Sequence, residues 1–90
     1  AIGKGVLHCI VLSDDEEHLF SGSYDMSLRM WRVKYGICVK EFLGHTSQVS
    51  SLAVSNDTKH LFSGSSDSTI RMWSVDKAEC IMTLVDTNKV

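Results

Sequence analysis

Two stretches of this 90-residue chain nearly repeat each other, and they decide its fold. Residues 18–33 read HLFSGSYDMSLRMWRV, and residues 60–75 read HLFSGSSDSTIRMWSV. The two windows agree at 11 of 16 positions, where unrelated sequences would agree at roughly one. The same shift of 42 residues aligns the preceding turns, since Ser13-Asp14-Asp15 matches Ser55-Asn56-Asp57. The chain is therefore two copies of one structural unit, aligned without a gap.

Each copy contains four segments with the pattern of short β-strands. Apolar and β-branched residues fill these segments, and clusters of Ser, Asn, Asp or Gly separate them. Because the connections are short, consecutive strands are expected to pair antiparallel as a meander. The predicted strands are residues 7–12, 18–23, 27–33 and 38–43 in the first copy, and residues 49–54, 60–65, 69–75 and 80–85 in the second. The sequence predicts an all-β fold.

The alternation along the predicted strands places bulky side chains on both faces of each sheet. Leu61 and Ser63 point to one face, and Phe62 points to the other. Such two-sided sheets are typical of sheets that stack on one another. Gly22 and Gly64 are predicted where a neighbouring backbone approaches closely. In a solitary pair of sheets, the apolar side chains expected to be exposed are Phe20, Phe62, Ile70 and Met72.

The spacing of a few residues resembles the WD-repeat family. Gly44-His45 precedes the first strand of the second copy, and Met72-Trp73 lies near the end of its third strand. The resemblance covers essentially the whole chain and implies two four-stranded antiparallel blades, a partial β-propeller. The first blade is expected at residues 1–43, with a partial N-terminal loop, and the second at residues 44–90, with a C-terminal tail. Arg32 and Ser74 stand where the family usually has the Asp of its closing Trp-Asp.

The resemblance also implies a structural tetrad of hydrogen-bonded His, Ser or Thr, Asp and Trp. A hydrogen-bonded chain that ends on a carboxylate satisfies polar groups whose burial would otherwise be costly. Gly3 stands where the first copy would need its His. A His, Ser and Asp together also suggest a catalytic triad, but their recurrence at the repeat period indicates architecture. The tetrad residues are His45, Ser63, Asp67 and Trp73 in the second copy, and Ser21, Asp25 and Trp31 in the first.

Composition excludes several classes of function. The net charge of −2 gives no general attraction to nucleic acid or to an anionic membrane, and no apolar run reaches the length of a membrane span. Three cysteines (Cys9, Cys38 and Cys80) without C-x-x-C spacing argue against a disulfide framework or a zinc site, and favour an intracellular location. The four histidines also lack metal-ligand spacing. We expect no catalytic site, no metal and no cofactor.

WD-repeat propellers are usually non-catalytic platforms, so the resemblance implies a protein or peptide partner. Partners often dock on the face formed by the turn between the second and third strands and by the loop that enters the first. Tyr24 is the preferred anchor, because an exposed tyrosine combines a large contact area with a hydroxyl. Its counterpart is Ser66, so the repeat does not require an aromatic ring there. The partner-binding candidates are Tyr24, Ser66, Gln48, Ser50, Val6 and His8.

Two blades cannot close a ring that normally takes about 4–8. The remaining blades are expected to come from a longer parent chain, which makes this chain a segment of a larger interaction scaffold. In the alternative, several copies of the chain assemble into one propeller. A third possibility is that the propeller recognises the substrate of a multi-subunit enzyme such as a ubiquitin ligase. In that case it would still be a binding module.

Overall fold

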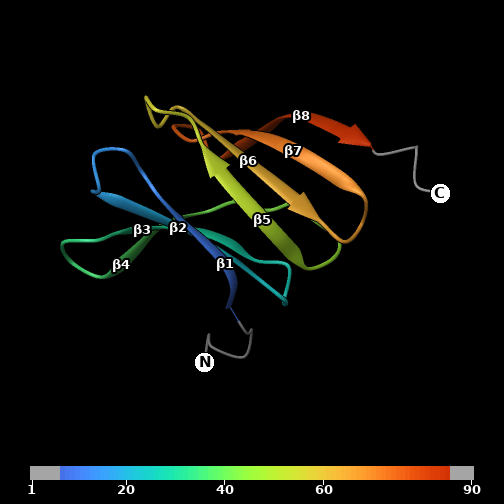
Figure 1. Ribbon diagram of the computed structural model, residues 1–90, viewed down its shortest axis with the longest axis horizontal. Helices are drawn as coiled ribbons and strands as arrows, with labels where there is room; N and C mark the ends of the chain where they lie inside the picture. The colour runs from blue at the N-terminus through green and yellow to red at the C-terminus, as the bar shows by residue number, and fades with distance from the viewer. Residues whose placement is uncertain (1–6, 86–90) are drawn as a thin grey trace.

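The computed structural model describes residues 7–85, and every regular element in that range is a β-strand (Figure 1). The first sheet contains β1 (Leu7–Leu12), β2 (His18–Ser23), β3 (Leu28–Arg32) and β4 (Ile37–Glu41). The second contains β5 (Val49–Val54), β6 (His60–Ser65), β7 (Thr69–Ser74) and β8 (Glu79–Val85). Consecutive strands pair antiparallel within each sheet. These sheets confirm the predicted all-β class. In the described range, no helix is long and apolar enough to cross a membrane.

Strand limits follow the predictions closely, with small differences at the turns. The predicted ranges 7–12, 18–23, 49–54 and 60–65 are those of β1, β2, β5 and β6. The third strand of the first sheet is shorter than predicted because its two flanking residues belong to turns. Ser27 O accepts from Ser23 N at 3.1 Å, and Val33 N donates to Glu17 O at 3.0 Å. Strand β4 starts one residue earlier than predicted and ends at Glu41, although Phe42 N still donates to Leu28 O at 2.8 Å.

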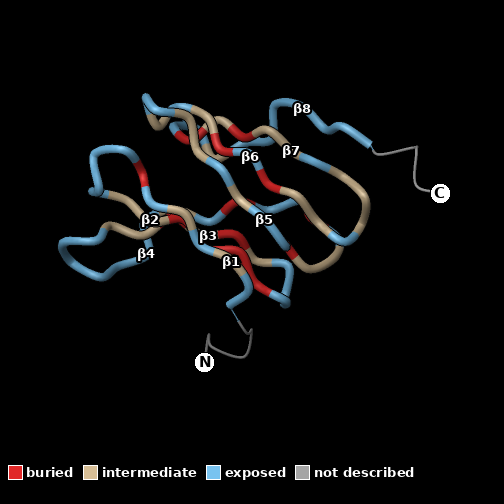
Figure 2. Tube along the Cα trace, viewed as in Figure 1, coloured by how far each residue is buried: buried red, intermediate tan, exposed pale blue. Residues whose placement is uncertain are grey.

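The sheets pack face to face and bury one shared core, and the buried residues of both sheets are coloured red along the trace in Figure 2. Phe42 links the two halves of this core, with its ring centroid 6.4 Å from that of Phe20 and 5.7 Å from that of Trp73. Burying apolar side chains in this way is the dominant stabilising contribution to such a fold. The core residues are Phe20, Leu28, Met30 and Phe42 from the first repeat, and Val49, Leu61, Trp73 and Val75 from the second. We call this contact between the sheets the seam.

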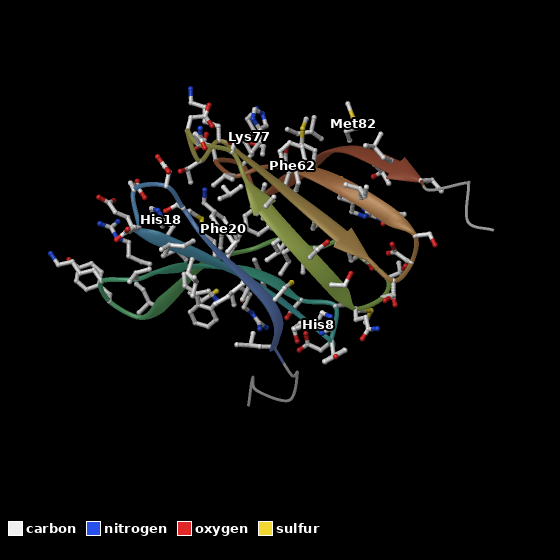
Figure 3. The ribbon with its side chains drawn as sticks, in the orientation of Figure 1. His8, His18, Phe20, Phe62, Lys77 and Met82 are labelled. Carbon is white, nitrogen blue, oxygen red and sulfur yellow. The ribbon has the colours of Figure 1, made fainter. Side chains whose placement is uncertain are left out.

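Burial at the seam corrects one prediction. Phe20 is fully buried, whereas its repeat equivalent Phe62 is 38% exposed. Figure 3 shows Phe20 between the sheets and Phe62 on the far side of the second sheet. Ile70 is 47% exposed on that far face, as predicted, while Met72 is only partly exposed. The expectation for Phe20 was wrong because its face of the first sheet is the one that the second sheet covers.

Gly22 and Gly64 also differ from the prediction of a close backbone approach. A Cβ atom on Gly22 would lie 2.6 Å from Cγ1 of Val49, a side chain of the other sheet. A Cβ atom on Gly64 would lie 2.6 Å from Oγ of Ser51, on the neighbouring strand. Side chains therefore fill the space at both glycines, and the one at Gly22 lets β5 pack tightly against the first sheet.

Candidate functional site

The predicted tetrad residues of the second copy lie in one hydrogen-bonded chain. Trp73 Nε1 donates to Ser63 Oγ at 2.8 Å, and that oxygen is 2.6 Å from His45 Nε2. His45 Nδ1 lies 3.4 Å from Asp67 Oδ2. Strands β6 and β7 fix this order, because their register places Ser63 and Trp73 on the same face, while His45 enters from the loop between the sheets. The geometry fits a neutral imidazole that accepts from Ser63 and donates to Asp67.

Asp67 ends this chain in a small cage of donors. Thr46 donates to Asp67 Oδ2 through both its N–H and its hydroxyl, each at 3.2 Å. The N–H of Thr69 donates to Oδ1 at 3.0 Å, and its hydroxyl also bonds Oδ1. Burial alone would raise the pKa of Asp67, but hydrogen bonds from Thr69, Thr46 and His45 outweigh it and hold the pKa well below the usual range. The carboxylate therefore stays ionised at the end of the network.

His45 is buried, and its protonation follows from that burial. Burial lowers the pKa of the imidazole, and the hydrogen bond and charge of Asp67 only partly oppose this shift. The ring stays neutral at neutral pH and stacks edge-on against Trp73, with the centroids 6.0 Å apart. Its Nε2 already accepts a hydrogen bond from the Ser63 hydroxyl, which is itself 1% exposed. The polar atoms of His45 and Ser63 are thus already paired within the network.

The first copy has a shorter version of this network. Trp31 Nε1 donates to Ser21 Oγ at 2.9 Å, and Asp25 Oδ1 accepts from Ser27 N at 3.0 Å. Hydrogen bonds from the side chain and backbone of Ser27 lower the pKa of Asp25. Within residues 7–85 no histidine bridges Ser21 and Asp25. Gly3, which aligns with His45, lies outside the described residues.

The partner-binding candidates gather at one end of the two sheets. His8 and Tyr24 form an edge-to-face pair with ring centroids 4.5 Å apart, and both side chains are exposed. In the second copy Gln48 Nε2 donates to Ser66 Oγ at 3.1 Å, close to the equivalent turn. Ser50 donates its hydroxyl to Gly64 O at 3.3 Å. We call the surface of His8, Tyr24, Gln48, Ser50 and Ser66 the rim. Val6, the remaining candidate, lies outside the described residues.

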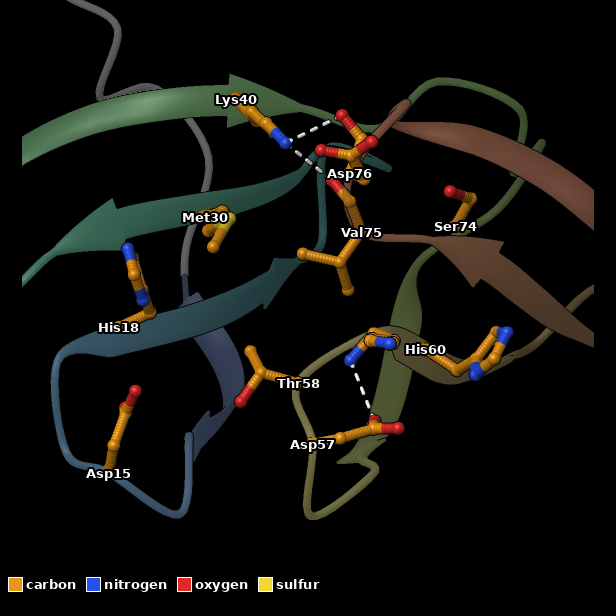
Figure 4. A pocket seen from close by; sticks show the side chains of 11 residues that line it. Asp15, His18, Met30, Lys40, Asp57, Thr58, His60, Ser74, Val75 and Asp76 are labelled. Atoms are coloured by element: carbon orange, nitrogen blue, oxygen red, sulfur yellow. Dashed lines mark hydrogen bonds between the residues drawn. The ribbon is translucent and has the colours of Figure 1, made fainter.

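A groove of about 640 Å³ opens along the seam at the opposite end of the sheets (Figure 4). It is lined by the β1–β2 turn of one repeat and by the β5–β6 and β7–β8 turns of the other, with His18 and His60 on its walls. Lys40 also lines the groove, and its Nζ donates to Val75 O at 2.6 Å and to Asp76 O at 2.8 Å. Lys40 thus ties the outer strand of one sheet to a turn of the next, a contact that the repeat alone did not predict. Met82 occupies the equivalent position in the second copy.

One turn beside this groove brings together side chains of the kinds that ligate metals. Asp15, Glu17 and His18 place one ligand atom each within 4.8 Å of one another. The Asp15 carboxylate already accepts from Ser13 Oγ at 2.6 Å and from Glu17 N at 2.9 Å. The second copy builds the same turn around Asp57, with Lys59 in place of Glu17. Because the turn forms equally well around a lysine, its geometry has a local explanation, and we assign no metal to it.

Comparisons with known proteins agree with this geometry. The family model described as WD40, WD domain, G-beta repeat, matches residues 3–32 and 36–74. The chain is 44% identical over 50 residues to F-box/WD repeat-containing protein 10 of Mus musculus, a match that covers 56% of this chain and 5% of that protein. It is 38% identical over 48 residues to the Homo sapiens protein called F-box and WD repeat domain containing protein 10B, covering 53% of this chain and 6% of that one. The chain thus spans only a small part of these relatives.

Solved structures share the arrangement of both sheets. The chain superposes on the structure titled "Structure of U3-55K" with a TM-score of 0.88 and 26% identity, over 96% of this chain and 28% of that one. The "Crystal structure of RRP9 WD40 repeats" gives a TM-score of 0.87 at the same identity and coverage. The two sheets therefore have the form and mutual packing of neighbouring blades in longer WD40 propellers.

Proposed function

We propose that this chain, which belongs to the WD domain, G-beta repeat (WD40) family, is a non-catalytic protein-binding segment of a larger β-propeller. Propellers of this family generally bind protein partners on exposed turns. A stiff sheet that presents its turns at one end favours recognition there, because little conformational entropy is lost on binding. The proposed binding surface is the rim, and the proposed partner is a protein or peptide, with neither a nucleic acid nor a membrane involved.

The aromatic pair at the rim carries this proposal. At positions where the second copy has Ser50 and Ser66, the first copy has His8 and Tyr24, whose rings pack edge to face. The two copies fold alike, so the fold does not require these rings. Tyr24 is 47% exposed and is held by His8, which limits the rotamer entropy that it would lose on binding. A pre-oriented exposed tyrosine is a favoured anchor of protein interfaces.

A pair of tyrosine variants tests this surface. Tyr24→Ala is expected to weaken a bound partner by about tenfold or more, as for a central interface tyrosine. Tyr35→Ala is the matched control, because Tyr35 is 62% exposed but lies on the β3–β4 turn at the other end of the sheet. Partners would be identified by proximity labelling of the full-length protein, and their affinities measured with purified components. Equal affinities of the two variants for every such partner would contradict the proposal that the rim is the binding surface.

The exposed apolar faces support the proposal that further blades are present. Phe62 and Ile70 are exposed on the second sheet, while their equivalents Phe20 and Leu28 are fully buried at the seam. A neighbouring blade would cover the former as the second sheet covers the latter. We propose that a longer parent chain supplies it. In the alternative, other copies of this chain supply it, and a native mass of three or four chains for the isolated polypeptide would favour that arrangement.

A further alternative is that the propeller recognises the substrate of a multi-subunit enzyme such as a ubiquitin ligase. The relatives whose names combine an F-box with WD repeats make this alternative worth testing. The binding surface would be the same rim, so catalysis would belong to another domain or subunit. An intracellular location accords with the free thiols of Cys9, Cys38 and Cys80.

A further inference from the structure

The hydrogen bonds of Arg29 in the first blade show how an arginine at this position of the repeat can be paired. Its Nε donates to Glu41 Oε2 at 3.1 Å, and its Nη2 lies 3.0 Å from the same oxygen. Glu41 stands directly opposite Arg29 in the β3–β4 ladder. The Arg29 Nη1 also donates to Ser27 Oγ at 3.3 Å. At this position of a blade, a guanidinium is thus paired with a carboxylate and a hydroxyl.

The equivalent arginine in the second blade, Arg71, lacks both partners. Thr83 faces it across the β7–β8 ladder in the place of Glu41. Thr69 replaces Ser27, and its hydroxyl bonds Asp67 instead. In the part of the chain that the structure describes, Arg71 Nε is buried without a hydrogen-bond partner. A buried charged donor without an acceptor is costly, and a carboxylate at the place that Glu41 holds in the first blade would remove that cost.

The guanidinium of Arg71 is also held in place. Gly44 has a φ of +155°, and a Cβ atom there would lie 3.0 Å from Arg71 Nη1 and 3.1 Å from the Trp73 ring. The loop backbone therefore packs closely against both side chains. The same Nη1 atom donates to Cys80 Sγ at 4.0 Å, and this sulfur lies 3.5 Å from Thr83 Oγ1. The Cys80 thiol donates to Met82 O at 3.5 Å, so the donors that face a ligand here are the guanidinium and the Thr83 hydroxyl.

We propose that Arg71 and Thr83, beside Cys80, bind an anionic side chain of a protein partner, at the place that Glu41 holds beside Arg29. Cys80 and Thr83 lie on β8, the exposed edge strand of the second sheet, so the partner can approach from outside the blade. Carboxylate and phosphate share the required chemistry, since both offer paired oxygens to a guanidinium. This site shares no residue with the rim, so a negative result at one site does not affect the proposal for the other.

The test follows the Nε–Hε NMR resonances of the arginines in the full-length protein while inorganic phosphate or acetate is added at constant ionic strength. The Arg71 resonance is expected to shift and saturate. Arg29 is the internal control and is expected to shift little, because its Nε is already paired with Glu41. Saturation by phosphate alone assigns the site to a phosphorylated side chain, and saturation by acetate assigns it to a carboxylate. An Arg71 shift no larger than that of Arg29 overturns the proposal.

A variant pair gives an independent check. Thr83→Glu places the chain's own carboxylate opposite Arg71, which copies the Arg29–Glu41 pair. It is expected to move the Arg71 resonance toward that of Arg29 without any added anion, and to abolish the response to phosphate or acetate. Thr83→Gln, of the same size but uncharged, is expected to leave the Arg71 resonance close to its original position. An undiminished anion response in Thr83→Glu contradicts the assignment.

Discussion

Trp73 carries both the packing and the polar network of the second blade. Its side chain is fully buried in the core, with 0% of its surface accessible to solvent. It contacts Phe42 across the seam and donates its indole N–H to Ser63. Its role in stability is a separate matter, and it can be measured.

Truncating Trp73 tests that role. Trp73→Ala is expected to lower the free energy of unfolding by about 3–5 kcal/mol, because it leaves a large cavity and removes the donor to Ser63. Trp73→Phe keeps most of the bulk but loses the N–H, so a cost of about 1–3 kcal/mol is expected from the unpaired network. Denaturant unfolding of both variants measures the two contributions. An unchanged unfolding midpoint in Trp73→Ala would contradict the core position.

The burial and pairing of some individual side chains could not be predicted from the sequence. Phe20 and Phe62 occupy the same position of the same repeat, yet only Phe20 is buried. The strand period assigns each ring to a face, but burial depends on whether another sheet covers that face. Part of the signal for the unpaired Arg71 is in the sequence, since aligning the copies places Arg71 at the position of Arg29 and Thr83 at the position of Glu41. Only the register shows that Glu41 lies opposite Arg29 and Thr83 opposite Arg71. That comparison of opposite positions requires the strand register, which the sequence alone does not supply.

At the scale of elements, the strands could be predicted because the repeat supports each one twice. The turns show what the sequence did not reveal. The same three turn positions adopt positive φ in both copies, although glycine occupies only one of the six. These residues are Glu16, Met26 and Gly36 in the first copy, and Thr58, Ser68 and Ala78 in the second. Ladder hydrogen bonds on both sides of each turn impose this geometry, so side-chain type alone is a poor guide to it.

Gly36 allows the free-energy cost of a positive φ to be measured without any steric contribution from neighbouring atoms. It has a φ of +65°, and no atom lies within 4 Å of where a Cβ would stand. Gly36→Ala is therefore expected to destabilise the fold by about 1 kcal/mol through backbone strain alone. Gly36→Asn is the matched control and is expected to cost less, because Asn tolerates this conformation. Thermal unfolding of the two variants provides the measurement, and an alanine variant as stable as the original would refute this reading of the turn.

Across the whole molecule, the two blades stack against each other and leave Phe62 and Ile70 exposed on the far face of the second sheet. The seam shows how such a face is covered, since Phe20, Leu28 and Met30 pack against Leu61, Trp73 and Val75. The sequence shows that the chain holds two repeats. It also predicted that the sheets stack, because bulky side chains occur on both faces of each predicted sheet. The seam groove and the Lys40 contact could not be predicted, because they depend on the angle at which one blade meets the next.

The proposal of a larger propeller places these two blades within a closed ring. Hydroxyl-radical labelling of the full-length protein tests this arrangement, because Phe20 and Phe62 are the same residue type at equivalent positions. Phe62 is expected to be labelled as slowly as Phe20, since a neighbouring blade would cover it. Tyr35, 62% exposed on an outer turn, reports the rate for an open aromatic ring. Phe62 labelled much faster than Phe20, at a rate typical of an open ring, would contradict the claim.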